Sequence, residues 1–127
     1  MTDSQPAPGA IAWHDLTVED AERLRDFYAA VAGWKPAPVD MGVYADFNML
    51  GTDGSPAAGI CHARGINANL PPQWLVYVVV SDLAASLEKC EALGGTLLAD
   101  RRPSGGFCVI RDPAGAVCAL YQAPGAP

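Results

Sequence analysis

The chain has 127 residues, of which 50% are hydrophobic and 17% charged, and it carries a net charge of −6. This length is enough for one domain with a proper core, and the composition is that of a globular rather than a disordered protein. The acidic balance argues against a nucleic-acid partner and against an acidic membrane surface, because no basic patch is available to neutralise phosphates. No apolar run is long enough to span a bilayer.

The ends and the cysteines both favour a cytoplasmic protein. The first residues lack the basic and apolar regions of a signal peptide, and residues 1–8 and 123–127 are expected to be unstructured. No Cys-x-x-Cys pair occurs. The favoured interpretation of the cysteines is small core residues in a reducing compartment, with a reactive thiol or a disulfide as the alternative. The four are Cys61, Cys90, Cys108 and Cys118.

The first half of the chain predicts a strand, a helix and then further strands. Residues 11–18 have the pattern of a strand. Asp20 is a good cap for a helix that continues to Val31 and ends at Gly33. The prolines of residues 35–38 indicate an extended connector or an edge strand. Two more strands follow, joined by a turn: residues 44–50, the turn 51–54, and residues 57–62.

The second half predicts the same order of elements after a linker at residues 64–73. It opens with a buried strand at residues 74–80. Asp82 caps a helix that ends at Gly94 and Gly95. Three short strands complete this half: residues 96–100, 107–111 and 116–121, the last two joined by a tight turn at 112–115.

Adding 62 to a residue number carries the first half onto the second. Asp20 then meets Asp82, and Gly33 meets Gly95. A repeated βαβββ unit is therefore visible inside a single domain spanning residues 1–127, with module one at about 10–63 and module two at about 74–122. Each helix should pack its apolar side chains on one sheet face: Leu24, Phe27, Val31, Leu83, Leu87 and Leu93.

Strand alternation divides the side chains of each sheet between two faces. Leu16 and Val18 should lie under the first helix, which leaves Trp13 and Asp15 on the opposite face. The repeat offset puts Leu75 and Tyr77 on the corresponding face of module two. On the same open face of module one we expect further side chains: Tyr44, Asp46, Asn48, Ala58, Ile60 and His62.

These features together resemble the vicinal oxygen chelate superfamily, also called the glyoxalase/bleomycin resistance protein/dioxygenase superfamily. The resemblance rests on Phe27-Tyr28, on Gly33-Trp34 and on the Asp-Pro-Ala-Gly turn at 112–115, and it covers nearly the whole chain. It implies an α+β fold in which two βαβββ modules form a glyoxalase/bleomycin resistance-like partial barrel around a cleft. Metal-dependent members chelate a divalent ion there.

The resemblance also implies where metal ligands would lie, and this sequence departs from the pattern there. The four positions fall on Trp13, Ala58, Leu75 and Ala119, none of which can bind a metal. We therefore expect neither metal nor cofactor. Two alternatives stay open: a one-residue register shift that turns His14 inward, and an unorthodox site of Asp15, Asp46 and His62.

The resulting prediction is a cytoplasmic protein that binds a small aromatic or apolar molecule without metal, of a sequestration or resistance type. The alternative is an enzyme of lyase, isomerase or dioxygenase type that uses Asp15 as acid or base, or a metal site not recognised in the sequence. A homodimer is expected because two modules leave open sheet edges, with or without module exchange. The predicted ligand contacts are Trp13, Tyr44, Asn48, Ile60, His62, Leu75, Tyr77 and Tyr121.

Overall fold

The computed structural model describes residues 6–123, apart from the side chains of residues 66 and 104. The predicted unstructured ends fall largely on residues 1–5 and 124–127, which lie outside the described residues. In chain order the elements are β1 (Ile11–Val18), α1 (Ala21–Ala32), β2 (Lys35–Asp40), β3 (Ala45–Leu50), β4 (Pro56–His62), η1 (Gly65–Asn67), β5 (Trp74–Val79), α2 (Leu83–Ala92), β6 (Thr96–Arg101), α3 (Arg102–Gly105), β7 (Phe107–Arg111) and β8 (Val117–Tyr121).

The elements repeat as predicted, and the fold class is α+β with two βαβββ modules. The chain forms two compact units, residues 13–74 and residues 75–127 together with residues 1–12. Each unit holds one predicted module, except that the first residues of β1 group with module two. The backbone accounts for that exception, because Gly9 N donates to Val79 O at 2.7 Å and Val79 N donates to Ala10 O at 2.9 Å.

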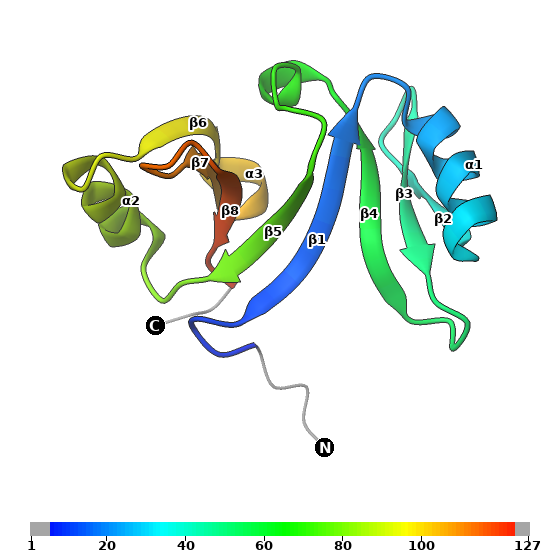
Figure 1. Cartoon of the computed structure of the whole chain (residues 1–127), viewed down its shortest axis with the longest axis horizontal. Coiled ribbons are helices and arrows are strands. Elements are labelled where there is room, and N and C mark those ends of the chain that lie inside the picture. Colours follow the sequence, from blue (N-terminus) through cyan, green and yellow to red (C-terminus); the bar gives the residue numbers. More distant parts are fainter. Residues whose placement is uncertain (1–5, 124–127) are drawn as a thin grey trace. The chain divides into compact units, whose positions relative to one another are not determined.

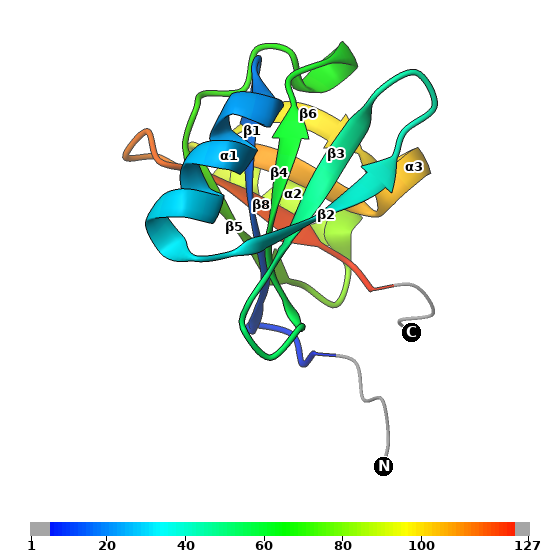
Figure 2. The same cartoon turned by 90° about the vertical axis from the view of Figure 1, so that its right-hand side faces the viewer.

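In module one the strands lie in the order β2-β3-β4-β1, with β1 and β4 parallel and the other pairs antiparallel. Helix α1 lies against one face of these strands (Figures 1 and 2). Asp20 caps it by accepting a hydrogen bond from Arg23 N at 3.1 Å, and Gly33 ends it in the left-handed conformation at φ 73°. The core between helix and strands is built on Ala21, Phe47, Met49 and Ile60.

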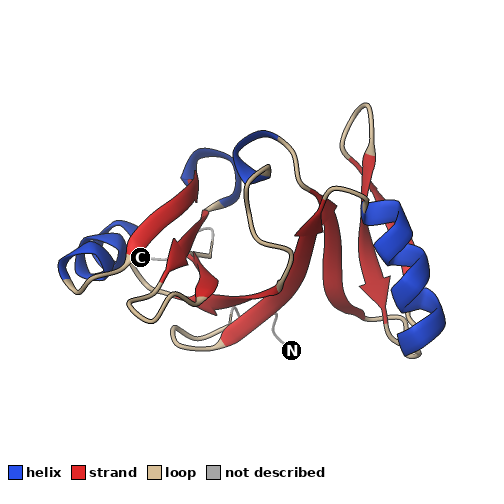
Figure 3. Ribbon diagram, turned by 45° about the horizontal axis from the view of Figure 1, so that its top comes forward, coloured by secondary structure: helices blue, strands red, loops and turns tan. Residues whose placement is uncertain are grey.

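Module two repeats this construction with strands in the order β5-β8-β7-β6. Asp82 caps α2 by accepting from Ala85 N at 3.1 Å, so both predicted caps are confirmed. The core beneath α2 contains Leu83, Leu87, Cys108 and Ile110. Each long helix thus covers one face of its own strands (Figure 3).

No helix among the described residues is long and apolar enough to cross a membrane.

Three of the six predicted helix-core residues are not packed. Phe27 is 52% exposed, Val31 66% and Leu93 77%. On α1 the contacts with the core are made by Ala21, Leu24 and Tyr28, whose spacing of three and four residues defines a stripe that leaves Phe27 and Val31 beside it. Leu93 follows the last turn of α2 as its C-cap.

The face assigned to β4 was also wrong. In the parallel pairing of β1 with β4, Asp15 lies beside Gly59 and Leu16 beside Ile60. Ile60 is fully buried in the core under α1, so the structure removes it from the predicted ligand contacts. A one-residue change of alternation exchanges the two faces of a strand. Because Gly59 has no side chain, the alternation of polar and apolar residues in β4 cannot be seen at that position. The larger Ile60 packs in the core under α1.

Two short helices interrupt segments that the sequence predicted as irregular or extended. The linker contains the 3-10 turn η1 at Gly65–Asn67, and α3 at Arg102–Gly105 follows β6 directly. Pro103 occupies the first turn of α3, where a missing N–H is tolerated. The predicted connector at residues 35–38 is the edge strand β2, which was one of the two alternatives.

Candidate functional site

An aromatic cluster joins the end of α1 to the start of β5. The ring of Tyr28 lies 5.8 Å from that of Trp34 and 5.3 Å from that of Trp74, and the two tryptophan rings are 5.8 Å apart. Trp74 Nε1 donates to the Tyr28 hydroxyl at 3.2 Å. This bond holds the Trp74 ring on edge to the other two, a favourable geometry for aromatic pairs. Tyr28 therefore has a structural role.

Beside this cluster lies a pocket of about 240 Å³. Its walls are two tryptophan rings, two alanines and one histidine: Trp34, Trp74, Ala57, Ala58 and His14. The volume is below the roughly 300–1,000 Å³ typical of sites for drug-sized ligands and above the roughly 150 Å³ of a cavity that takes up benzene. Its size and lining therefore suit a molecule of one or two rings.

A second group of side chains surrounds His62 at the end of β4, and we call Tyr44, Asp46, His62 and Arg64 the His62 cluster. Asp46 Oδ1 accepts from His62 N at 2.9 Å and lies 3.2 Å from His62 Nδ1. The Tyr44 ring stands edge-on to the His62 ring at 5.3 Å, and the Arg64 guanidinium lies 4.1 Å above the Tyr44 ring. Both Asp46 and His62 are half-buried, with side chains 15% and 16% exposed.

The predicted pair Trp13 and Asp15 does share one face of β1. A side chain at Gly59 would begin 3.2 Å from Asp15 Cβ and 3.4 Å from Trp13 Cζ2, so the glycine makes room for both. Asp15 is buried, with 8% exposure, as predicted for the ionisable group inside the sheet. Asn48 pairs with Gly59 and is half-buried. His62 lies elsewhere: its strand neighbour is Val18, which packs in the core under α1.

The predicted contacts of module two lie on the strands β5 and β8. Leu75 and Tyr77 are buried at 1% and 8% exposure, and Tyr121 is half-buried. The Tyr77 ring contacts Phe107 at 5.2 Å. Neither Tyr77 nor Phe107 belongs to the core under α2, in agreement with the predicted division of faces.

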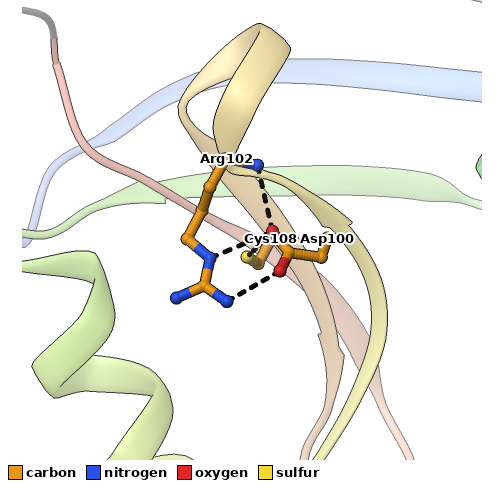
Figure 4. A network of polar contacts seen from close by, with 3 residues as sticks. All are labelled: Asp100, Arg102 and Cys108. Atoms are coloured by element: carbon orange, nitrogen blue, oxygen red, sulfur yellow. Dashed lines mark hydrogen bonds and ion pairs between the residues drawn. The ribbon is translucent and has the colours of Figure 1, made fainter.

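A polar network in module two joins Arg102, Asp100 and Cys108. The Arg102 guanidinium donates to both oxygens of Asp100, at 3.0 and 2.7 Å (Figure 4). This pairing holds the pKa of Asp100 well below its usual range. The Cys108 thiol donates to Asp100 Oδ1 at 3.5 Å, and burial, reinforced by this bond, raises the pKa of Cys108 to about 11. Arg102 is thus already paired, and Cys108 is a poor nucleophile.

Comparison with known proteins places the chain in a family. The Glyoxalase-like domain matches residues 13–121. The chain belongs to the glyoxalase-like domain family. This confirms the resemblance to the vicinal oxygen chelate superfamily drawn from the sequence, and the two βαβββ modules agree with it.

Two curated relatives show how the glyoxalase-like chain compares with longer proteins. CFP32 of Mycobacterium bovis, whose name describes it as a candidate glyoxylase, is 31% identical over 128 residues, which cover 94% of this chain and 48% of that protein. The anthracycline biosynthesis protein DnrV of Streptomyces peucetius is 28% identical over 131 residues, covering 91% of this chain and 48% of that protein. The chain thus spans about half the length of the curated relatives it matches.

A solved structure supports the fold of this glyoxalase-like chain. The methylmalonyl-CoA epimerase of Mycobacterium tuberculosis superposes with a TM-score of 0.55 at 17% identity, covering 97% of this chain and 94% of that one. At this level of identity the similarity concerns the fold.

The divalent ion of metal-dependent superfamily members does not fit the donors of this glyoxalase-like chain. Within residues 6–123, no three His, Cys, Asp or Glu side chains come together as metal ligands would. Asp46 and His62 are the strongest partial set, but they are two donors already bonded to each other. A site closed by protein side chains needs more converging oxygen, nitrogen or sulfur donors.

The sequence missed the tryptophan-lined pocket because its walls come from segments far apart in the chain. In the sequence, Trp34 follows the end of the first predicted helix and Trp74 begins the strand predicted at residues 74–80. The sequence did contain one signal for this pocket: Trp34 and Trp74 each lie next to the end of a helix or strand, where large rings commonly fill the space between elements. His14 was considered as a metal ligand, and it instead lines this pocket.

Proposed function

We propose that this glyoxalase-like chain binds a small planar molecule of one or two rings, without metal, in the pocket lined by Trp34 and Trp74. The observation that carries the proposal is the pocket of about 240 Å³ between these two rings, Ala57, Ala58 and His14. Two indole rings favour a flat ligand, because stacked or edge-on aromatic pairs gain roughly 0.5–1.5 kcal/mol beyond burial. His14 supplies one polar group that can orient it.

The names of the relatives are consistent with small-molecule chemistry but do not decide between binding and catalysis. DnrV is named for the biosynthesis of an anthracycline, a class of compounds with flat fused rings, which favours planar ligands. CFP32 is named for an enzymatic activity. A catalytic role for Asp15 stays a prediction, as do the ligand contacts proposed for the open faces of the two modules. Organisation as one domain, a homodimer and a cytoplasmic location are further parts of this proposal.

The test compares a flat probe with a non-planar one. We expect 1-naphthol to quench tryptophan fluorescence saturably and cyclohexanol to bind at least tenfold more weakly. Replacing Ala57 with leucine fills the pocket while leaving the core untouched, and should weaken naphthol binding at least tenfold, about 1.4 kcal/mol. Trp34→Leu should weaken it by roughly 2- to 10-fold through loss of one ring. EDTA should leave the affinity unchanged within twofold.

The matched control is Trp13→Leu, which removes an indole outside the pocket. If this variant lost naphthol binding while Ala57→Leu kept it, the ligand would lie on the open face predicted from the sequence instead. Equal binding of naphthol and cyclohexanol would contradict a planar ligand. Thermal melting of each variant separates loss of the pocket from loss of the fold.

A further inference from the structure

The His62 cluster lies outside the tryptophan-lined pocket, and its geometry points to a second activity. We propose that it is a hydrolytic site, in which His62 activates a water molecule against a small ester that carries a carboxylate, and Arg64 binds that carboxylate. The proposal rests on three features of the cluster: the orientation of the His62 ring, the uncommitted charge of Arg64, and the Tyr44 ring that both contact.

Asp46 fixes the orientation of the His62 ring. Its Oδ1 lies 3.2 Å from His62 Nδ1 and also accepts from the His62 backbone N at 2.9 Å. An ionised carboxylate can only accept, so Nδ1 carries the proton and Nε2 presents its lone pair. The ring meets Asp46 through Nδ1, so this carboxylate leaves Nε2 unengaged. A carboxylate in this position also stabilises the imidazolium that forms when Nε2 takes up a proton.

Arg64 differs from Arg25 and Arg102, each of which forms an ion pair with an aspartate. Arg25 is bonded to Asp26 at 2.8 Å and Arg102 to Asp100 at 2.7 Å, whereas no carboxylate in the described part of the chain pairs with Arg64. Its guanidinium carbon lies 4.1 Å above the Tyr44 ring, a contact that uses the face of the ring and takes up none of the N–H donors of the arginine as an ion pair would. The planar fork of these donors matches the two oxygens of a carboxylate, and an exposed Arg64 can reach one in solution.

The Tyr44 ring sets the spacing between the two groups. The His62 ring lies 5.3 Å from it and Arg64 Cζ lies 4.1 Å from it. Arg64 Cζ is therefore no further from the His62 ring than the sum of these distances. Because Arg64 is exposed and its side chain can move, we expect one small ester with two methylene groups between its carboxylate and its carbonyl to reach both residues.

The chemistry follows from the groups present. The cluster contains no serine, threonine or cysteine, so water is the nucleophile. His62 Nε2 takes a proton from the water as its oxygen forms a bond to the ester carbonyl carbon, and the carbonyl electron pair moves to oxygen. When that pair returns, the bond to the alcohol oxygen breaks, and the alcohol leaves with the electrons and takes the proton from His62. The products are an alcohol and a second carboxylic acid group, which loses its proton to water to give a dicarboxylate.

The experiment uses the whole chain with two chromogenic esters, mono-4-nitrophenyl succinate and neutral 4-nitrophenyl acetate. His62→Gln should lower kcat/KM for the succinate ester by roughly 10²-fold, and Asp46→Asn should lower it by a smaller factor. Arg64→Gln should lower kcat/KM about tenfold for the succinate ester and less than twofold for the acetate. The matched control for Arg64→Gln is Arg23→Gln, another exposed arginine whose side chain lies outside both sites, and it should keep the wild-type rate.

A pH profile separates proton transfer from a structural effect. Activity on the succinate ester should depend on pH in the wild-type chain, and this dependence should be missing in His62→Gln. The charged groups facing the ring are Asp46 on β3, Arg64 after β4 and Arg25 of α1, which lies 4.8 Å above the Phe47 ring beside His62. These three charged groups are still present in His62→Gln. If one of them caused the pH dependence, the variant would keep it.

Three outcomes would overturn the proposal: wild-type activity in His62→Gln, an equal loss of activity in Arg23→Gln and Arg64→Gln, or an equal effect of Arg64→Gln on both esters. Arg64 is exposed, so its variant tests the proposal even if the His62 variant does not fold. Naphthol binding should be unaffected in Arg64→Gln. Failure of the hydrolytic proposal is thus distinguishable from failure of the binding function.

Discussion

At the scale of single residues, small side chains decide which larger ones can share a face. Gly59 sits directly beside Asp15 in the pairing of β1 with β4. A methyl group there would begin 3.2 Å from Asp15 Cβ, closer than atoms in a packed core normally approach, and 3.4 Å from Trp13 Cζ2, which is an ordinary contact. The open face of module one therefore depends on a glycine in mid-strand, where its usual effect is to weaken the strand.

Replacing Gly59 with alanine should lower the free energy of unfolding by about 1–3 kcal/mol, because Trp13 and Asp15 are forced apart. The matched control is Gly51→Ala, since an added methyl there meets nothing closer than the Asp53 carboxylate oxygen, at 3.4 Å. That variant should change stability by less than about 0.5 kcal/mol. Urea unfolding measures both. An equal effect at the two sites would mean that the crowding at Gly59 is relieved without cost.

At the scale of elements, the two modules use the same device to begin their long helices. Asp20 and Asp82 each accept a hydrogen bond from the backbone N–H three residues later, at 3.1 Å in both cases. Without the cap, one of the four N–H groups that a helix leaves unpaired at its start would lose its protein partner. The repeat in sequence thus reflects a repeat in hydrogen bonding.

Asp20→Ala and Asp82→Ala should each lower the free energy of unfolding by about 0.5–2 kcal/mol. The double variant should show the sum within about 0.5 kcal/mol, since the caps lie on separate helices and share no partner. Asparagine caps as well as aspartate, so Asp20→Asn is the control and should stay near the wild-type value. A loss in Asp20→Asn as large as in Asp20→Ala would show that charge, rather than the cap, matters.

At the scale of the whole molecule, apolar side chains remain exposed on module one. Phe27 is 52% exposed, Val31 66% and Val43 91%. Exposed apolar residues that gather in a patch commonly mark a protein interface, and the edge strands β2 and β6 of the two modules offer unpaired backbone groups. These two features support the proposed homodimer.

Light scattering should therefore give twice the mass of the chain at micromolar concentration. Val31→Asp should shift the equilibrium toward the monomer at least tenfold, because the charge would be buried in the interface. It should leave the melting temperature of the diluted protein nearly unchanged, as Val31 lies outside the core. Ala30→Asp on the same helix is the control for helix propensity. A wild-type monomer at that concentration would contradict the proposal.

The sequence by itself determined the elements, their repeat and the fold class. Caps such as Asp20 and Asp82, helix stops such as Gly33 and the turn at 112–115 act through neighbours a few residues away, so local chemistry is enough to place them. The sequence also determined which side chains of β1 and β5 share a face, because both faces of these strands carry large side chains and the alternation is easy to recognise.

Only the tertiary structure decided the face of β4 and the walls of the pocket. In β4 the glycine at position 59 interrupts the alternation of polar and apolar side chains. The burial of Ile60 in the core under α1 sets the face of the strand, although His62 on the same face is polar. Trp34 and Trp74 lie forty residues apart in number, and they meet because α1 and β5 bring their ends together around Tyr28. Contacts of this kind depend on how elements pack, which residue spacing along the chain does not record.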